Sequence, residues 1–112
     1  MEFTFRGNNA YLISKNVFRL SLVHTQKDEF KKNETLKRRV EKSSLCITSL
    51  IVKAILAKSE KEKAEIIKDL MHLIYSLCAL YDIALDLGLI GKKDLYLIET
   101  ALKELIEEIK KL

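Results

Sequence analysis

An all-α fold, an antiparallel up-down four-helix bundle, is predicted by three features of the sequence. The 112 residues include no proline and only three glycines, so little interrupts a helix. Leu, Ile, Lys and Glu, which lose little conformational freedom in helices, are abundant. Four segments carry apolar residues at alternating spacings of three and four, as in helix bundles. Because 48% of the residues are apolar, residues 1–112 are predicted to form a single domain around one core.

Asparagines mark the starts of the first two predicted helices. Asn8 or Asn9 can cap a helix over about residues 10–27, and Asn33 can cap a second helix over about residues 34–58. The first helix is expected to direct Ile13, Val17 and Leu20 toward the core. The second is expected to direct Leu36, Val40, Ser43, Ile47, Leu50 and Ala54.

The third and fourth helices have stronger boundary signals. Ser59 and Glu62 form a capping-box pattern, in which a hydroxyl and a carboxylate satisfy free amides at a helix start. Gly88 can take the left-handed conformation that ends a helix. The third helix is therefore expected over about residues 60–87 and the fourth over about residues 92–111. The core-facing residues of the fourth are predicted to be Leu95, Ile98, Leu102, Leu105, Ile109 and Leu112.

Charge is distributed unevenly along the chain. Residues 1–61 carry 13 Lys and Arg against 6 Asp and Glu, a net charge of +7. Residues 62–112 carry 7 against 10, a net charge of −3. Part of the surface is therefore expected to attract polyanions, although a solvated basic face without a partner explains the pattern equally well.

No segment has the pattern of a targeting signal or a membrane span. The start, Met1–Arg6, lacks a basic region followed by an apolar run and a cleavage site. The longest apolar run, Leu45–Ala57, is interrupted by polar residues and is shorter than the roughly 20 residues that cross a bilayer. We expect a soluble, cytoplasmic protein with no membrane partner, in which Cys46 and Cys78 are buried and reduced.

The sequence offers little for catalysis. His24 and His72 stand alone, and together with the two cysteines they match no zinc-binding spacing. Asp82 and Asp86 are one helical turn apart, but with no base, nucleophile or metal ligand beside them they are more simply part of an acidic solvent face. We expect no enzymatic activity, no small-molecule substrate, no cofactor and no metal site.

The candidate functional residues form a basic cluster around the start of the second predicted helix. Lysine binds phosphate as a point charge and arginine binds it as a planar fork. Phe30 is the one aromatic residue nearby, which favours contact with a nucleic-acid backbone over base stacking. The candidate nucleic-acid-binding residues are Lys31, Lys32, Lys37, Arg38, Arg39, Lys42 and Lys53.

The third predicted helix is apolar over more of its circumference than one core requires. Its apolar arc covers roughly 200°, about twice the stripe of a surface helix. Surplus apolar surface of this kind is typical of a subunit interface. The candidate oligomer-interface residues are Ile66, Met71, Leu73, Cys78, Leu80 and Leu85. The alternative is that this helix is buried centrally in a small bundle.

Two stretches resemble known four-helix-bundle proteins. The run Phe30-Lys31-Lys32-Asn33-Glu34, with Leu36, Arg38-Arg39-Val40 and Ser44-Leu45-Cys46-Ile47, resembles the second-helix region of proteins encoded in intervening sequences of bacterial 23S ribosomal RNA genes. The run from Leu80 to Tyr96 is similar to the junction of helices three and four in the accessory variability determinants of diversity-generating retroelements.

This resemblance implies an assembly and a set of partners. Members form basic homopentameric barrels of four-helix protomers, and the retroelement members bind RNA and a reverse transcriptase. It also implies that Arg38 and Arg39 are basic contacts and that Gly88 and Leu89 are structural. Two functions therefore remain open. One is a non-catalytic accessory protein that binds RNA and possibly a reverse transcriptase. The other is a protein-binding helical scaffold that uses the apolar surface of the third helix without nucleic acid.

Overall fold

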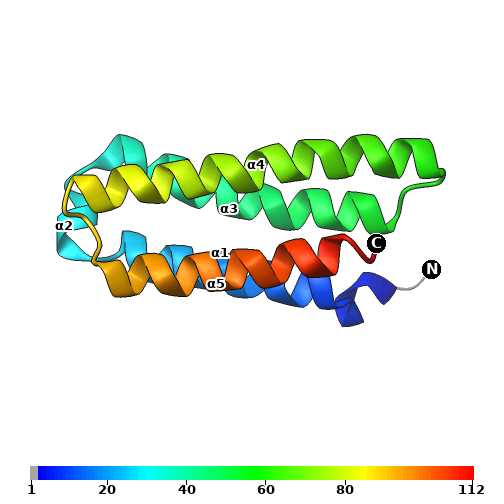
Figure 1. Ribbon diagram of the computed structural model, residues 1–112, viewed down its shortest axis with the longest axis horizontal. Helices are drawn as coiled ribbons and strands as arrows, with labels where there is room; N and C mark the ends of the chain where they lie inside the picture. The colour runs from blue at the N-terminus through cyan, green and yellow to red at the C-terminus, as the bar shows by residue number, and fades with distance from the viewer. Residues whose placement is uncertain (1–2) are drawn as a thin grey trace.

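The computed structural model describes residues 3–112, and within them every regular element is helical. A short 3-10 helix, η1 (Thr4–Gly7), is followed by the α-helices of the bundle (Figure 1). These are α1 (Asn9–Thr25), α2 (Asp28–Lys31), α3 (Glu34–Ile55), α4 (Glu60–Asp86) and α5 (Lys92–Ile109). The all-α prediction is thereby confirmed. The long helices begin within one residue of their predicted starts, while α1 and α3 end two and three residues before their predicted ends.

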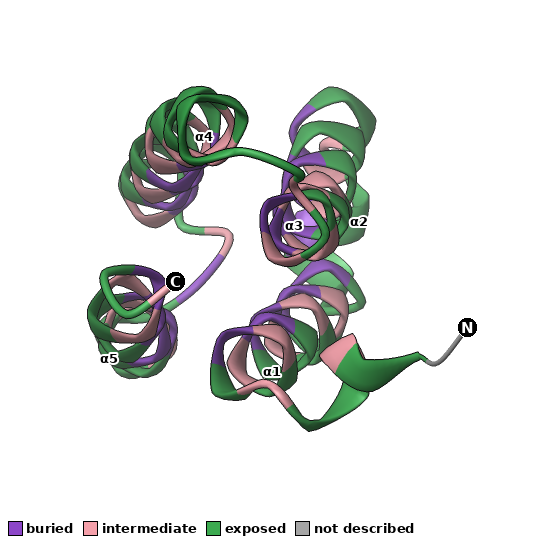
Figure 2. Cartoon of the chain, turned by 90° about the vertical axis from the view of Figure 1, so that its right-hand side faces the viewer, coloured by how far each residue is buried: buried purple, intermediate pink, exposed green. Residues whose placement is uncertain are grey.

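The four long helices run antiparallel to their neighbours and enclose one core (Figure 2). Each packs against two others, in the order α1, α3, α4, α5 around the bundle. One layer of the bundle is thus formed by α1 and α3, and the opposite layer by α4 and α5. The result is a rod with extents of 43 × 23 × 22 Å.

Local hydrogen bonds explain where the helices begin. The backbone N–H groups of Ala10 and Leu36 donate to the side-chain oxygens of Asn8 and Asn33, at 2.8 and 3.1 Å. Such caps satisfy amides that have no partner within the helix. The predicted capping box before α4 forms, but its carboxylate accepts from the amide one residue earlier than expected. Ser59 Oγ accepts from the Glu62 amide at 3.1 Å, whereas the Glu62 carboxylate accepts from the Lys58 amide.

Gly88 ends α4 as the sequence predicts. Its φ of +74° lies in the left-handed region, which costs glycine little because it has no Cβ. The Leu89 and Gly88 amides then donate to the carbonyls of Ala84 and Leu85, at 2.9 and 3.0 Å, in a Schellman motif. The chain turns back on itself here, so that Ile90 is buried under the end of the bundle.

The core differs from the sequence prediction most clearly in α1. Val17 is buried as predicted, but the rest of the buried face consists of small and polar residues, including Ser14, Ser21 and His24. The predicted core residues Ile13 and Leu20 are only half-buried beside them. These small side chains face α4 across the core, where the buried residues Leu70, Ile74, Leu77 and Tyr81 are larger.

The connection between α1 and α3 is more ordered than its polar sequence suggests. It contains α2, which inserts Phe30 into the core with 0% of its surface exposed. Full burial of a phenylalanine side chain stabilises a fold by about 1.5–3 kcal/mol, which favours the docking of this short helix. None of the helices within residues 3–112 has the length and apolar character needed to cross a membrane.

Candidate nucleic-acid interface

The fold separates the charges of the chain into two layers. Residues 3–58, which include α1 and α3, carry 12 Lys and Arg against 4 Asp and Glu, a net charge of +8. Residues 59–112, which include α4 and α5, carry 8 against 11, a net charge of −3. Because α1 and α3 lie side by side, opposite α4 and α5, the asymmetry of the sequence becomes an asymmetry between faces of the bundle (Figure 2).

The candidate basic residues lie on α3 and just before it. Lys31 belongs to α2 and Lys32 follows it, while Lys37, Arg38, Arg39, Lys42 and Lys53 belong to α3. All of them are exposed except Lys37, which is half-buried. The structure therefore places the set along α2 and α3, with Lys53 separated from Lys42 by about 16 Å at the helical rise per residue.

Ion pairs divide these cations into two groups. Lys32 pairs with Glu29 at 3.2 Å, Lys37 with Glu41 at 3.3 Å, and Arg38 with Glu34 at 3.3 Å. Within the described residues, the remaining four cations have no ion-pair partner: Lys31, Arg39, Lys42 and Lys53. Exposed pairs of this kind contribute little to stability, so Arg38 and Lys32 can exchange their carboxylates for phosphates at small cost.

Helical periodicity directs these side chains to different sides of α3. Arg38 and Lys42 lie on the outer side, whereas Lys37 faces α1, where Glu41 accepts a 2.7 Å hydrogen bond from Thr25 Oγ1. Arg39 and Lys53 lie toward α4. The basic surface is thus centred on the outer edge of α3, with Arg38 and Lys42 in its middle.

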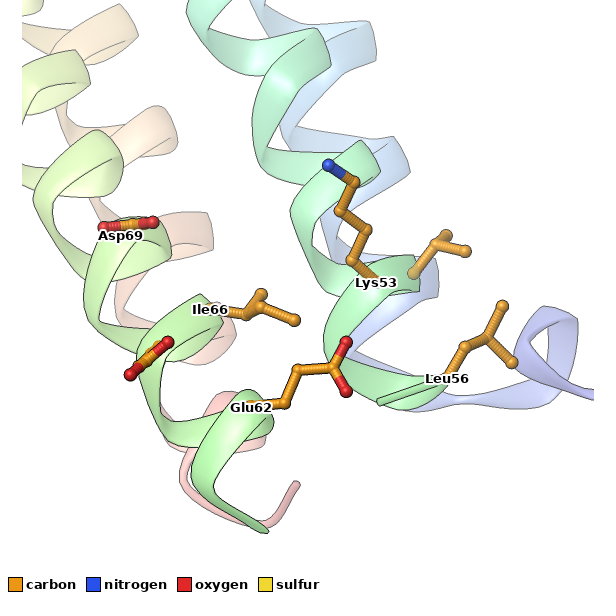
Figure 3. Close-up of a pocket in the computed structure, with 7 residues that line it drawn as sticks. Lys53, Leu56, Glu62, Ile66 and Asp69 are labelled. Carbon is orange, nitrogen blue, oxygen red and sulfur yellow. The ribbon is translucent and has the colours of Figure 1, made fainter. Parts of the chain in front are cut away.

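Lys53 lines an open groove of about 510 Å³ between the end of α3 and the start of α4 (Figure 3). The α4 side of this groove carries Glu62, Glu65 and Asp69. In Figure 3 the Lys53 amino group extends along α3, away from the Glu62 carboxylate. The carboxylates disfavour a phosphate inside the groove, so Lys53 serves the basic surface only from its rim.

A buried chain of hydrogen bonds between α1 and α4, which sequence reasoning missed, lies at the opposite end of the bundle, with a carboxylate of α5 nearby. His24 of α1 is 2% exposed, and its Nδ1 lies 2.7 Å from the hydroxyl of the fully buried Tyr81 on α4. That hydroxyl also lies 3.3 Å from Ser21 Oγ. On the other side of the ring, His24 Nε2 lies 3.7 Å from Oδ1 of Asp94 on α5.

Burial sets the protonation states along this chain. Desolvation lowers the pKa of His24, assisted by the charge of Lys27 and opposed by that of Asp94. Desolvation also raises the pKa of Tyr81. Burial alone would raise the pKa of Asp94, but hydrogen bonds from the Gly91 amide and Lys27 lower it. At neutral pH the chain therefore consists of an ionised carboxylate, a neutral imidazole and a neutral phenol.

This chain has the composition of an acid–base relay but not its accessibility. Both Tyr81 and Ser21 are completely buried, and none of the grooves described for the molecule is lined by His24, Tyr81 or Ser21. An acid–base group has to reach a substrate proton to within hydrogen-bond distance. The hydrogen bonds are therefore suited to holding α1 and α4 together across the core. A buried histidine facing a buried tyrosine across the bundle leaves no periodic signal in the sequence.

The candidate oligomer-interface residues flank the core. Five of them are half-buried and pack against it: Met71, Leu73, Cys78, Leu80 and Leu85. The sixth, Ile66, lines the groove of Figure 3. The large apolar side chains that α4 exposes to solvent are instead Tyr75 and Ile83, Leu87 follows directly after the helix, and α5 adds Tyr96 and Leu97. Much of the apolar arc of α4 is thus occupied by α3 and α5 within one chain.

The acidic candidates are exposed. Asp82 and Asp86 lie on the solvent side of α4, and within residues 3–112 no group of three or more His, Cys, Asp or Glu side chains is placed to hold a metal ion. Burial raises the pKa of Cys78, and the charges of Glu99 and Asp82 raise it further, so this thiol stays protonated.

Comparisons of the chain with protein-family models, curated proteins and solved structures find no match.

Proposed function

We propose that this domain is a non-catalytic accessory protein that binds RNA through the outer edge of α3. The observation that supports the proposal is the set of exposed cations Arg39, Lys42 and Lys53, which have no carboxylate partner within residues 3–112 and lie in the basic layer of the bundle. Arg38 joins them by giving up an exposed ion pair. Phosphates that bind such residues release counterions, which favours association at low salt.

The decisive experiment is a salt titration of RNA binding by fluorescence anisotropy. We expect log K to fall linearly with log salt concentration, by roughly 0.7–0.9 for each phosphate contact. In the triple variant Arg38→Gln, Arg39→Gln, Lys42→Gln, the slope should decrease by about 2 to 3, and affinity at low salt should fall accordingly. A matched control changes three exposed lysines of the acidic layer, Lys68→Gln, Lys92→Gln and Lys103→Gln. Equal losses in both variants would contradict the assignment to α3.

The resemblance described above extends the proposal to an assembly. By analogy, five copies would form a ring in the cytoplasm and present the basic surface to RNA and to a reverse transcriptase, as in diversity-generating retroelements. Exposed Tyr75 and Ile83 of α4, and Leu87 directly after it, are available for contacts between copies. Light scattering on a sizing column at moderate salt tests this directly, because a pentamer has five times the 12.9 kDa mass of the chain.

A protein-binding scaffold is the second candidate, and the exposed apolar side chains of α4 and α5 favour it. This function predicts a monomer or dimer that ignores RNA at moderate salt and binds an apolar dye. The same sizing and salt-titration experiments separate the two candidates. Salt-dependent RNA binding that is lost in the α3 triple variant is expected only of the first.

A further inference from the structure

The first helix extends the basic surface beyond α3. Helix α1 contains no Asp or Glu, and its Lys15 and Arg19 are both exposed. Neither forms an ion pair within the described residues. Their neighbours are neutral, since Arg19 Nη2 donates to Asn16 Oδ1 at 2.6 Å and Lys15 Nζ lies 5.2 Å from the centre of the Tyr11 ring. Both cations therefore keep their full charge for a partner.

The register between α1 and α3 places these two cations where α3 has none. Residues 43–52 of α3 carry no charge, which leaves a gap between Lys42 and Lys53. The hydrogen bond from Thr25 Oγ1 to Glu41 Oε2 fixes the antiparallel register of the two helices. Counting from it, Arg19 is level with about Ile47 and Lys15 with about Ile51. Counted along the bundle axis, the cations of the two helices, which we call the basic row, span about 22 Å from Arg38 to Lys53.

Within the described residues, α1 and α3 expose no aromatic ring on which bases could stack. The exposed ring of Phe3 lies before α1, and the Arg6 guanidinium lies 4.8 Å from its centre. The Tyr11 ring is covered by Phe5, whose centroid lies 5.0 Å away, and by the Lys15 side chain. Phe18 is half-buried and Phe30 is fully buried. The exposed tyrosines belong to α4 and α5, in the acidic layer. Proteins that bind single strands usually combine a basic groove with such aromatic platforms.

We infer that the basic row of α1 and α3 binds double-helical RNA, with Lys15 and Arg19 as part of the contact surface. The inference rests on the function proposed above and names its substrate class. Two adjacent helices present several exposed cations and no exposed aromatic side chain, which suits phosphates recognised by shape better than stacked bases. A flexible single strand gains affinity when its bases stack on aromatic side chains, and α1 and α3 expose none within the described residues.

The test compares a mixed-sequence RNA duplex of about 16 base pairs with one of its own strands, since a duplex of that length spans the footprint of a typical shape-reading domain. Binding of the full chain to each probe is measured by anisotropy between 50 and 200 mM salt, a range over which phosphate contacts are resolved. We expect at least tenfold tighter binding to the duplex. In the variant Lys15→Gln, Arg19→Gln, the salt slope on the duplex should decrease by about 1.8.

A control variant of equal charge, Lys68→Gln, Lys103→Gln, alters only α4 and α5 and should bind the duplex like the wild type. Equal or tighter binding to the single strand would overturn the choice of duplex. An unchanged slope in the Lys15→Gln, Arg19→Gln variant, alongside a loss in the α3 triple variant, would confine the site to α3. Failure of every probe to show salt-dependent binding would instead overturn the proposed function itself.

Discussion

Replacing Tyr81 by phenylalanine removes a single hydroxyl from the centre of the buried hydrogen-bond chain. That hydroxyl lies 2.7 Å from His24 Nδ1 and 3.3 Å from Ser21 Oγ, and the residue is 0% exposed. Because no solvent reaches the site, Tyr81→Phe leaves the imidazole nitrogen without a partner. Leaving one buried polar group unpaired costs about 1–3 kcal/mol, and the phenyl ring itself still fills its space.

The expected loss can be measured by urea denaturation followed by circular dichroism. The free energy of unfolding of a small domain falls by about 1–3 kcal/mol for each molar of urea, so the midpoint of unfolding should fall by about 1 M. The matched control is Tyr96→Phe, which removes a hydroxyl from a tyrosine that is 69% exposed and should change stability by less than about 0.5 kcal/mol. Equal midpoints for the two variants would refute the view that the buried chain stabilises the bundle.

Two further predictions concern His24 and Gly88. Burial lowers the pKa of His24 below its value of 6.5 in the unfolded chain, so between the two values the unfolded state binds more protons. The free energy of unfolding should therefore be at its full value above pH 6.5 and should fall as the pH drops toward the native pKa. Urea midpoints of the wild type, measured across this pH range, should show the fall. If the same fall persists in His24→Leu, His24 is not its cause. Gly88→Ala places a Cβ in open space but at a φ of +74°, so backbone strain alone should cost about 1–2 kcal/mol, whereas Gly7→Ala should be nearly neutral in the same assay.

Helix boundaries could be predicted because their causes are local in sequence. Asn33 and Ser59 cap helices whose free amides lie within three residues, and Gly88 needs only its own backbone freedom to end α4. Each signal is complete within one or two turns of chain. The predicted positions of these starts and stops consequently lie close to those in the structure.

The packing face of α1 could not be predicted in the same way. Hydrophobic periodicity favours Ile13 and Leu20, yet Ser21 and His24 face the core because Tyr81, 57 residues beyond His24, supplies their hydrogen-bond partner. A polar residue is stable inside only when such a partner exists, and the partner is set by tertiary structure. The candidate site also depends on which helices are neighbours. The cations of α1 lie beside those of α3 because these two helices pack together, and the sequence alone does not show this.

The surplus apolar surface of α4 illustrates a related difficulty. In sequence, the residues flanking its core-facing stripe have the same character whether a second copy or a neighbouring helix covers them. In the structure, Met71 and Leu80 pack against the core of their own chain, while Tyr75 is exposed. Periodicity identifies the apolar face of a helix. The two neighbouring helices decide which part of that face stays exposed and can contact a partner.

The division of charge between the two layers of the bundle has a kinetic consequence. A positive layer opposite a negative one gives the rod a permanent electric dipole across its short dimension. In the field of a polyanion such a molecule experiences a torque that turns α1 and α3 toward the nucleic acid before any contact is made. Orientation during approach, rather than the strength of the final contacts, would then set how often an encounter is productive, and this advantage would disappear as salt shortens the range of the field.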